Sequence, residues 1–404
     1  MRPLLVAFML ALPLAAWAQT APLTEAEALR LGLSRVELSD LERATVGAAE
    51  ADAEAAGLMP NPTLGYSRER MRGVGGATDE TWQLAQTFDF SGRRGLRQEA
   101  AGRRVDAAAA GNAARRAELA GEIRRRFHEV LRGQQTVQVT ETWGQRFARV
   151  EATVGKLTAA GEASGYDLRR LGRERQTAQA KLATERAALE RSRERLAALL
   201  GKPGSHANVV GQLLPGPLPA LEASLATLER RPDLQMLARR AEAADLEGRA
   251  AARGWAPDVT VGLGTKHSDN GIVRDNGAIV TLSMPLPVFD RRQAEEKRAA
   301  ADALNARAEY GLARSRAEGE LRGLHRQAAG LMAAAIDFRS RAAAASPDLL
   351  RIAEAAYQGG ESTLLELLDA YRGALETEIT ALDLEARARE ARIDHDLLTG
   401  SITE

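Results

Sequence analysis

The sequence predicts a mainly α-helical protein with four short β-strands, arranged as two similar halves. Alanine, arginine, glutamate and leucine dominate, while aromatic residues make up only 4% of the 404 residues, a bias typical of long helices and coiled coils. Gly161-Glu162 recurs as Gly360-Glu361, at an offset of 199 residues, and further motifs recur at offsets of 195 and 198. Four short segments alternate apolar and polar residues with a period of two, as strands with one apolar face do.

The N-terminus has the pattern of a secretory signal peptide over residues 1–18. Arg2 supplies the positive charge, Leu4 to Ala16 form an apolar region, and a small-residue cleavage site ends at Ala18. The apolar region is too short to cross a bilayer of about 30 Å as a helix, so we expect cleavage and export. The sequence has no cysteine, so neither disulfides nor a lipid-modified cysteine are expected.

The charge balance argues against nucleic acid as a partner. Lys plus Arg and Asp plus Glu both number 55, so the formal net charge is zero. Beyond the signal peptide, the sequence contains no run of 18 apolar residues, and no transmembrane helix is expected.

The recurring motifs divide the rest of the chain into four parts. Repeat 1 covers residues 19–201, with a helix, a strand pair at about 63–90 and a long helical hairpin. A proline-rich linker at 202–219 separates it from repeat 2 at 220–400, which has a helix, a strand pair at about 259–285 and a second hairpin. Residues 401–404 form a C-terminal tail.

The strands are each expected to place their apolar residues on one face. The intervening segments Met71–Asp79 and Lys266–Asn276 are rich in Gly, Asp and Asn and are predicted to be hairpin loops. The residues predicted for the apolar, lipid-facing side are Leu64, Tyr66, Trp82, Leu84, Phe88, Phe90, Val259, Val261, Leu263, Val280, Leu282 and Met284.

Between the strand pairs the periodicity becomes helical. Gly95 to Leu157 contains no proline and predicts a helix, or stacked helices, reaching about 90 Å. Ser346-Pro347-Asp348 is interpreted as an N-cap followed by proline at the first helical position. Near the C-terminus two adjacent seven-residue rows predict a helix that packs on two neighbours, as in a closed tube of helices: Leu368, Leu375 and Leu382, and Ile379, Ala386 and Ile393.

Four strands alone cannot form a closed membrane sheet. In hydrocarbon every backbone group must be paired, and the smallest closed outer-membrane barrels have about eight strands. Two copies of the chain would give eight strands and three would give twelve, and the residues alone do not decide between them. A small soluble sheet whose apolar face covers a core would also fit four such strands.

Four phrases, in order along the two halves, carry a resemblance to a known family. They are "TAAGEASGYDL" at 158–168, "RRPDLQMLARRAEAADLEGRAAARGWAPDVTVG" at 230–262, "PLPVFDRRQAEEKRA" at 285–299 and "AYQGGESTLLELLDAYRGAL" at 356–375. With these phrases the chain resembles the TolC-like outer-membrane factor family, also called outer membrane efflux proteins, over essentially its whole mature length. "NPTLGYS" and "QTFDFSGRRGLRQEAA" are most similar to the branch that confers cobalt, zinc and cadmium resistance.

The resemblance implies an architecture, a location and partners. We expect a homotrimer with a twelve-stranded barrel in the outer membrane of a Gram-negative bacterium and an α-helical tunnel in the periplasm. A periplasmic membrane-fusion adaptor and an inner-membrane transporter of the RND type are the implied protein partners, and outer-membrane lipid surrounds the barrel.

The resemblance also assigns the periplasmic constriction to Glu366 and Asp369. These residues are three apart and share one helical face, so a trimer would present rings of carboxylates that concentrate cations. On their residues alone, a solvated helix face explains them as well.

Further positions match the family's gate and its adaptor-docking tips. Tyr357 matches the gating tyrosine and Asp167 its acidic partner, but Ser362 stands where the family has an arginine, so a hydrogen bond would have to replace the salt bridge. The hairpin tips, where the resemblance implies adaptor docking, contain Gly161, Glu162, Gly360 and Glu361.

The sequence indicates neither an enzyme nor a resident metal or cofactor. His128, His206, His267, His325 and His395 are scattered without zinc-site spacing. The run Arg124-Arg125-Arg126 is interpreted as a charged helix face, and the glycines at 73–76 do not open a helix as a phosphate-binding loop would.

We therefore expect a passive outer-membrane channel of a tripartite efflux system, with heavy-metal cations as substrate. Drug efflux and type I protein secretion use the same framework and remain open. A periplasmic adaptor would have a single hairpin, and a structural coiled-coil protein would have no paired amphipathic strands, so both classes fit the two similar halves less well.

Overall fold

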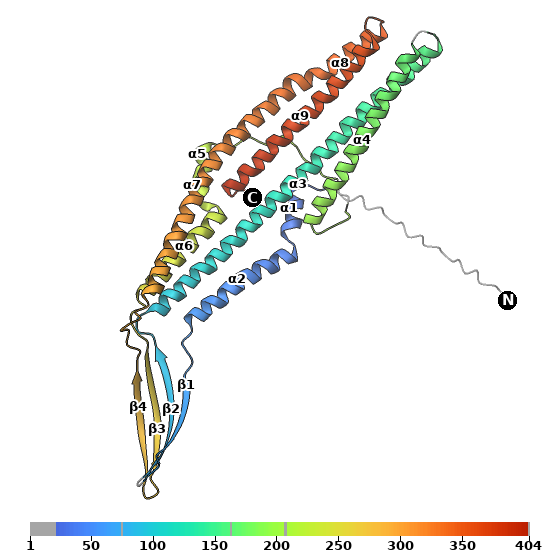
Figure 1. The fold of residues 1–404 in the computed structure, drawn as a ribbon. Coiled ribbons are helices and arrows are strands. Elements are labelled where there is room, and N and C mark those ends of the chain that lie inside the picture. The colour runs from blue at the N-terminus through green and yellow to red at the C-terminus, as the bar shows by residue number, and fades with distance from the viewer. Residues whose placement is uncertain (1–21, 74–75, 162–163, 206–207, 403–404) are drawn as a thin grey trace, which may run out of the picture.

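The computed structural model describes residues 22–73, 76–161, 164–205 and 208–402 of the chain. It is elongated, with a four-stranded sheet at one end, two long helical hairpins at the other, and short helices around the middle (Figure 1). The predicted signal peptide lies outside the described residues. No helix in the described ranges has an apolar stretch long enough to cross a bilayer.

The same order of elements occurs in each half of the chain. The first half comprises α1 Glu25–Leu33, α2 Val36–Gly57, β1 Thr63–Arg70, β2 Thr78–Phe88, α3 Arg93–Ala159 and α4 Gly165–Leu199. The second half comprises α5 Leu221–Ala226, the short 3₁₀ helix η1 Leu228–Arg230, α6 Pro232–Ala252, β3 Val259–Asp269, β4 Arg274–Ser283, α7 Gln293–Phe338, the π-helical η2 Arg339–Ala343, α8 Ala344–Gln358 and α9 Leu364–Thr399. The predicted duplication of the chain stays a prediction.

The four strands form one antiparallel sheet in the order β1-β2-β3-β4. Leu64 is opposite Leu84, Leu84 is opposite Leu263, and Leu263 is opposite Val280. Because directly opposed residues point to the same side of a sheet, this register places the apolar residues of all four strands on one face.

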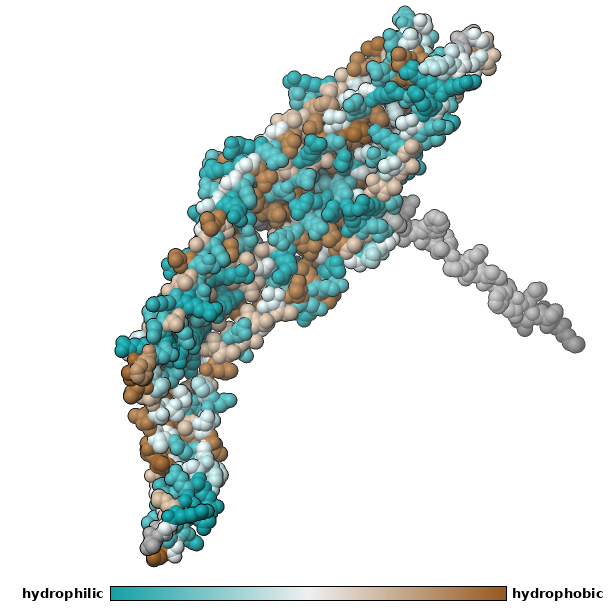
Figure 2. All heavy atoms as spheres, viewed as in Figure 1, coloured by the Kyte–Doolittle hydropathy of each residue, from teal (hydrophilic) through white to brown (hydrophobic). Residues whose placement is uncertain are grey.

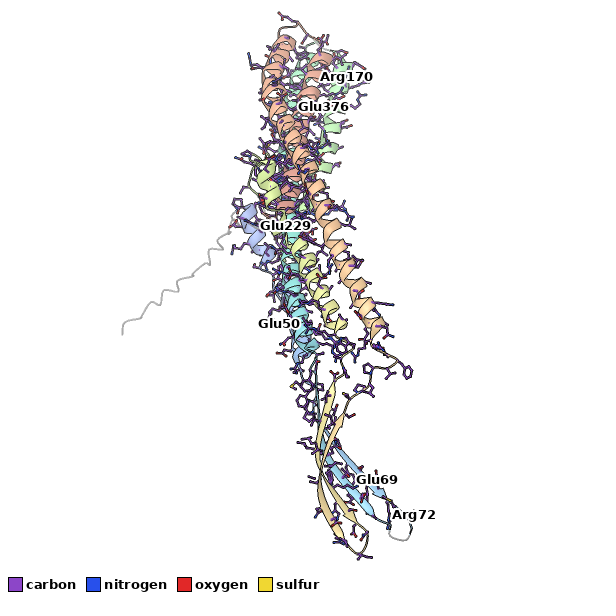
Figure 3. The ribbon with its side chains drawn as sticks, turned by 90° about the vertical axis from the view of Figure 1, so that its left-hand side faces the viewer. Glu50, Glu69, Arg72, Arg170, Glu229 and Glu376 are labelled. Atoms are coloured by element: carbon purple, nitrogen blue, oxygen red, sulfur yellow. The ribbon has the colours of Figure 1, made fainter. Side chains whose placement is uncertain are left out.

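The strands extend further toward the hairpin ends than the sequence predicts. Lys266 to Asp269 belong to β3 and Arg274 to Asn276 to β4, so the predicted loop 266–276 is wrong at both ends. Cross-strand charge pairs stabilise this polar half, with Lys266 Nζ 2.8 Å from Asp79 Oδ2. Glu69 and Arg72 lie at the end of the sheet furthest from the helices (Figure 3).

The strands also stop earlier than predicted at the helical end. Phe90 lies two residues beyond the end of β2, and Met284 follows the last residue of β4. Asp89 explains the first of these ends, because its carboxylate accepts hydrogen bonds from the backbone N–H groups of Ser91 (2.8 Å) and Arg94 (3.0 Å), which turns the chain into α3.

The proline-free stretch from Gly95 to Leu157 is a single helix. It lies within α3, whose 67 residues span about 100 Å at about 1.5 Å per residue. In the second half, α7, η2 and α8 take the corresponding place and join without a loop. The interpretation of Pro347 as the first residue of a helix is wrong: it lies inside α8, a few residues after the π-helical turn, which absorbs the disturbance of the hydrogen-bond ladder.

The middle of the molecule contains the largest apolar core. Ile123 and Phe127 of α3 are fully buried and pack with residues from α1, α4, α9 and the linker. From the predicted row of α9, Leu368, Leu375 and Leu382 are all buried, which confirms that this row forms a packing face.

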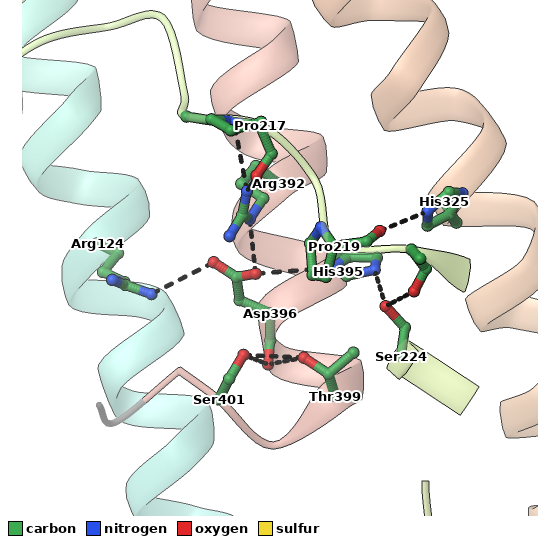
Figure 4. A network of polar contacts seen from close by, with 12 residues as sticks. Arg124, Pro217, Pro219, Ser224, His325, Arg392, His395, Asp396, Thr399 and Ser401 are labelled. Atoms are coloured by element: carbon green, nitrogen blue, oxygen red, sulfur yellow. Dashed lines mark hydrogen bonds and ion pairs between the residues drawn. The ribbon is translucent and has the colours of Figure 1, made fainter. Parts of the chain in front are cut away.

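Polar contacts fasten the linker to the C-terminal helix (Figure 4). Arg392 donates to the carbonyl oxygen of Pro217 (2.7 Å) and to Asp396 (2.7 Å), while Arg389 donates to the carbonyl oxygens of three successive linker residues, 212–214. His325 of α7 bonds the carbonyl oxygen of Pro219 (3.0 Å). These contacts hold the linker against α7 and α9 of the second half at mid-height.

Candidate functional site

The tip end of the two hairpins contains the predicted gate. α3 and α4 form one hairpin and α8 and α9 the other, and the four helices meet in one apolar cluster (Figure 1). The buried residues of this tip cluster are Phe147, Val154, Leu171, Leu350, Leu364, Leu367, Leu368 and Tyr371. Because these residues come from both hairpins, separating the hairpins would expose an apolar core.

Two aromatic side chains of the tip cluster also make polar contacts. The hydroxyl of Tyr371 donates to Glu354 Oε1 of α8 (2.7 Å), and the indole of Trp143 in α3 donates to the backbone carbonyl oxygen of Tyr371 (3.2 Å). Burial and the hydrogen bond to Glu354 raise the pKa of Tyr371, so its hydroxyl stays a donor at physiological pH.

An ion pair joins the two hairpins across the tip cluster. Glu174 of α4 bonds Arg372 of α9, and the Glu174 side chain is only 7% exposed. The hydrogen bond from Arg372 lowers the pKa of Glu174 more than burial raises it, so this carboxylate is charged. This pair was not predicted from the sequence, since its members are 198 residues apart and each looks like an ordinary helix-surface charge. The offset matched that of the repeats and could have suggested the contact.

The three predicted gating residues lie beside this cluster. Tyr357 packs against it, and its pKa is raised by burial and by the nearby carboxylate of Asp167. The buried hydroxyl of Ser362 makes no hydrogen bond within the described residues, so the expected contact in place of the family's salt bridge is not seen among them. The structure thus brings Tyr357 close to Asp167, while Ser362 bonds neither of them.

The predicted constriction residues are both exposed in the first turns of α9. The Glu366 carboxylate accepts hydrogen bonds from the backbone N–H (2.8 Å) and hydroxyl (3.1 Å) of Thr363, and its own N–H donates to the Thr363 hydroxyl (3.3 Å). This capping box gives Glu366 a structural role that was not predicted, although the pattern Thr-x-x-Glu is typical of it. Asp369 has no ion-pair partner in the described part of the chain.

The hairpin tips turn at glycines. Gly161 and Gly360 have φ angles of 81° and 75°, the left-handed region that other residues rarely adopt. Glu361 is exposed next to Gly360, and Glu162 lies outside the described residues. The predicted docking role of these positions stays a prediction.

At the other end, one face of the sheet exposes the predicted apolar residues. Leu64, Leu84, Val280 and Leu282 are each more than half exposed, while Phe88, Val259 and Val261 are half-buried. The opposite face is polar, with Gln83 bonded to Thr281 and the hydroxyls of Thr87 and Thr260 2.8 Å apart. Such a sheet can separate an apolar from an aqueous environment.

A group of serine, histidine and aspartate side chains lies at mid-height of the molecule. Ser224 lies 3.2 Å from His395 Nε2, and Asp396 lies 3.5 Å from the other ring nitrogen (Figure 4). His395 is fully buried and Ser224 is 2% exposed, so a substrate has no access and the group is structural. Among the described residues, no three His, Asp or Glu side chains come together as a metal site, and His206 lies outside them.

The fold of the chain is also found in several outer-membrane channels of known structure. The structure is similar to the outer-membrane channel OprN (TM-score 0.77, 21% identity, covering 94% of this chain and 91% of that one). It is also similar to CusC (TM-score 0.77, 19% identity, 93% and 91% coverage) and to VceC from Vibrio cholerae (TM-score 0.76, 20% identity, 93% and 96% coverage).

Sequence comparison finds similarity to outer membrane efflux proteins in the second half of the chain and to two metal-resistance proteins. Residues 225–401 match the family model described as outer membrane efflux protein, so the chain carries this domain. It is 28% identical to the cobalt-zinc-cadmium resistance protein CzcC of Cupriavidus metallidurans, over 88% of this chain and 86% of that protein. It is 26% identical to the nickel-cobalt-cadmium resistance protein NccC of Alcaligenes xylosoxydans, over 66% of this chain and 61% of that protein.

Proposed function

We propose that this chain is the outer-membrane channel of a tripartite efflux system and that it conducts heavy-metal cations out of the cell. Three copies form the channel, with a shared twelve-stranded barrel in the membrane and a tunnel of helical hairpins in the periplasm. An inner-membrane RND transporter supplies the energy, and a periplasmic adaptor connects it to the tips at Gly161, Glu162, Gly360 and Glu361. The outer membrane efflux protein domain supports this proposal.

The observation that carries the proposal is a sheet with one exposed apolar face and two unpaired edges. β1 and β4 each have a strand neighbour on one side only within the described sheet. Unpaired backbone groups cost several kcal/mol each in hydrocarbon, on the order of the transfer cost of an amide, so the edges must pair when the apolar face contacts lipid.

Further copies of the chain can supply this pairing. The three antiparallel pairings make β1 and β4 run in opposite directions. In a cyclic assembly, β4 of one copy therefore meets β1 of the next as an antiparallel neighbour, and the ring closes with every edge paired.

Cysteine cross-linking tests this closure. The chain has no native cysteine, so Tyr66→Cys in β1 can be combined in turn with Ala278→Cys, Val280→Cys or Leu282→Cys in β4. We expect at least one combination to give, on oxidation in membranes, covalent species up to three chains on denaturing gels. Ala85→Cys, in the inner strand β2, is the control and should give none. Only monomers from all three combinations would contradict the shared barrel.

The metal substrate is supported by the relatives and by the charges at the tips. CzcC and NccC are both named for resistance to cobalt and cadmium. In a threefold assembly the exposed Glu366 and Asp369 would each become three carboxylates around the axis, which attract cations and repel anions.

Neutralising these carboxylates should reduce the cation preference of the channel. Glu366→Gln is suited to the test, because glutamine can still accept the capping hydrogen bonds of Thr363 and the helix start is kept. We expect Glu366→Gln with Asp369→Asn to shift the reversal potential of bilayer conductance in a salt gradient toward zero. Glu320→Gln with Asp302→Asn, at exposed positions of α7, is the matched control. Unchanged selectivity would remove Glu366 and Asp369 from the conduction pathway.

Binding of the adaptor opens the channel in this proposal. A ligand shifts an equilibrium only as far as it binds one state more tightly than the other, so the adaptor must contact the open tips more favourably than the closed ones. The tip cluster and the Glu174–Arg372 pair are the contacts that opening would have to break.

A further inference from the structure

Exposed apolar side chains lie at the junction between the sheet and the helices. We call this group the collar; its members are Leu58, Met59, Phe90, Trp255, Leu286 and Phe289. Phe289 is 94% exposed, Phe90 75% and Trp255 64%. Figure 2 shows hydrophobic residues at this junction, a mixed surface on the helices and mainly hydrophilic residues toward the hairpin end of the sheet.

The collar draws on every crossing between helix and sheet. Its residues come from the connections α2–β1, β2–α3, α6–β3 and β4–α7, which are the four crossings in the chain. Four separate connections thus place apolar side chains at one level of the molecule. Exposed apolar groups that gather in this way mark a binding surface.

Cations without partners lie directly beside the collar. Arg94 follows Phe90 by four residues and Arg291 follows Phe289 by two, and both side chains are exposed without an ion pair or hydrogen bond to the described residues. Their neighbours are engaged: Arg93 bonds Asp258 (2.6 Å) and Arg253 bonds the carbonyl oxygen of Ser91 (3.3 Å). Arg94 and Arg291 are therefore free to bind an anion.

The level of the collar matches one boundary of a bilayer. From Trp82 to Phe88 the apolar face extends about 20 Å at about 3.3 Å per residue, close to the apolar band of about 25 Å in outer-membrane proteins. Charged residues, including Lys266 and Asp79, follow at the hairpin end. The collar follows at the other end, where aromatic residues accumulate at membrane interfaces.

We propose that the collar lies at the periplasmic face of the outer membrane, where Arg94 and Arg291 bind the phosphate groups of phospholipids. The apolar side chains enter the boundary between headgroups and acyl chains, and the guanidinium groups contact phosphate oxygens from the periplasmic side. This inference rests on the proposed membrane insertion of the sheet. It adds a phospholipid site outside the strands, on the connections to the helices.

Lipid retained by purified channels tests the arginines. Full-length Arg94→Gln/Arg291→Gln protein and wild type are reconstituted in vesicles of phosphatidylethanolamine with phosphatidylglycerol, re-extracted, and analysed for bound phosphatidylglycerol by native mass spectrometry. We expect a loss of about fivefold per arginine, the size of one juxtamembrane charge. The control Arg191→Gln/Arg316→Gln removes two exposed, unpaired arginines from α4 and α7 and should retain lipid as wild type does.

Two results would overturn this part of the proposal. One is equal retention by the double variant and the control. The other is release of the lipid from wild type by inorganic phosphate alone, which would assign the arginines to free phosphate. Conductance is recorded for every sample, so channels that conduct but fail the lipid test would overturn the collar proposal and leave the proposed function intact.

Fluorescence quenching tests the position of the apolar residues independently. Trp82→Phe/Trp143→Phe leaves Trp255 as the reporter, since Trp17 lies in the segment expected to be cleaved. We expect lipids brominated near the headgroup to quench Trp255 more than lipids brominated at the chain end. Absence of quenching by either lipid in conducting channels would show that protein covers the collar, and would refute the proposal.

Discussion

Replacing Gly264 with alanine is expected to abolish assembled channels in the outer membrane. A Cβ atom at this position of β3 would lie 2.1 Å from the carbonyl oxygen of Trp82 and 2.9 Å from the Cα of Gln83, both backbone atoms of β2. Backbone atoms in a paired strand cannot move aside without breaking the pairing. Overpacking alone typically costs ~1–3 kcal/mol, and the separated strands would add unpaired groups.

The β2–β3 pairing is also where the strand pairs of the two halves join, so its loss divides the sheet. The measurement is the yield of heat-modifiable trimers in outer-membrane fractions. Gly277→Ala is the matched control, because a Cβ at that position of β4 would meet nothing within 4 Å. Assembly of Gly264→Ala at the level of this control would show that β2 and β3 do not pair as described.

Replacing Arg372 with glutamine is expected to raise the resting conductance of the channel. The substitution removes the cation that bonds the nearly buried Glu174 from the other hairpin and leaves only Arg173 of its own helix, 3.6 Å away. Breaking a fully buried pair costs ~3–5 kcal/mol, and we expect about 1–3 kcal/mol here because the Arg372 side chain is 46% exposed. If the pair holds the hairpins together only in the closed state, its loss shifts the closed-to-open equilibrium by roughly 5- to 150-fold.

Single-channel recordings in planar bilayers would measure this shift. Arg322→Gln is the control, since it breaks an exposed pair with Glu318 within the single helix α7. An open probability unchanged from wild type would show that the Glu174–Arg372 pair does not restrain the closed state.

The same pair predicts a pH dependence. The pKa of Glu174 is held below its usual value by the hydrogen bond from Arg372, which outweighs burial. The Glu174–Arg372 pair therefore stabilises the closed tips fully above the pKa of an unfolded glutamate, about 4.3. This stabilisation is lost as the pH falls through the lower pKa that Glu174 has in the folded protein. The conductance of the wild-type channel should rise on acidification below about pH 4. The conductance of Arg372→Gln should not show this rise.

The sequence predicted the features that depend on local pattern. The apolar face of each strand could be predicted because the alternation of apolar and polar residues is a property of neighbouring residues. The register of the sheet brings the apolar rows of all four strands to one side. The long helix and the Leu368 row followed in the same way from helical periodicity. The charged ends of β3 and β4 were missed, because cross-strand pairs such as Lys266 with Asp79 replace apolar contacts there.

Features that depend on contacts between distant segments could not be predicted. Pro347 looked like a helix start, yet the packing of α8 on α9 in the tip cluster keeps the helix continuous. Glu174 and Arg372 acquire their role only when two hairpins meet. Ser362 shows the limit of the resemblance, because it stands where the family has an arginine and its buried hydroxyl makes no hydrogen bond among the described residues.

The π-helical turn at Arg339–Ala343 separates two stretches of helix whose side chains are out of phase. An additional residue rotates everything that follows by about 100° at 3.6 residues per turn. Mutations in α8 that change its contacts with α9 therefore do not have to preserve the heptad phase of α7. This turn is a natural junction for chimeras, in which the tip of one homologue is exchanged for that of another while the membrane half keeps its own packing.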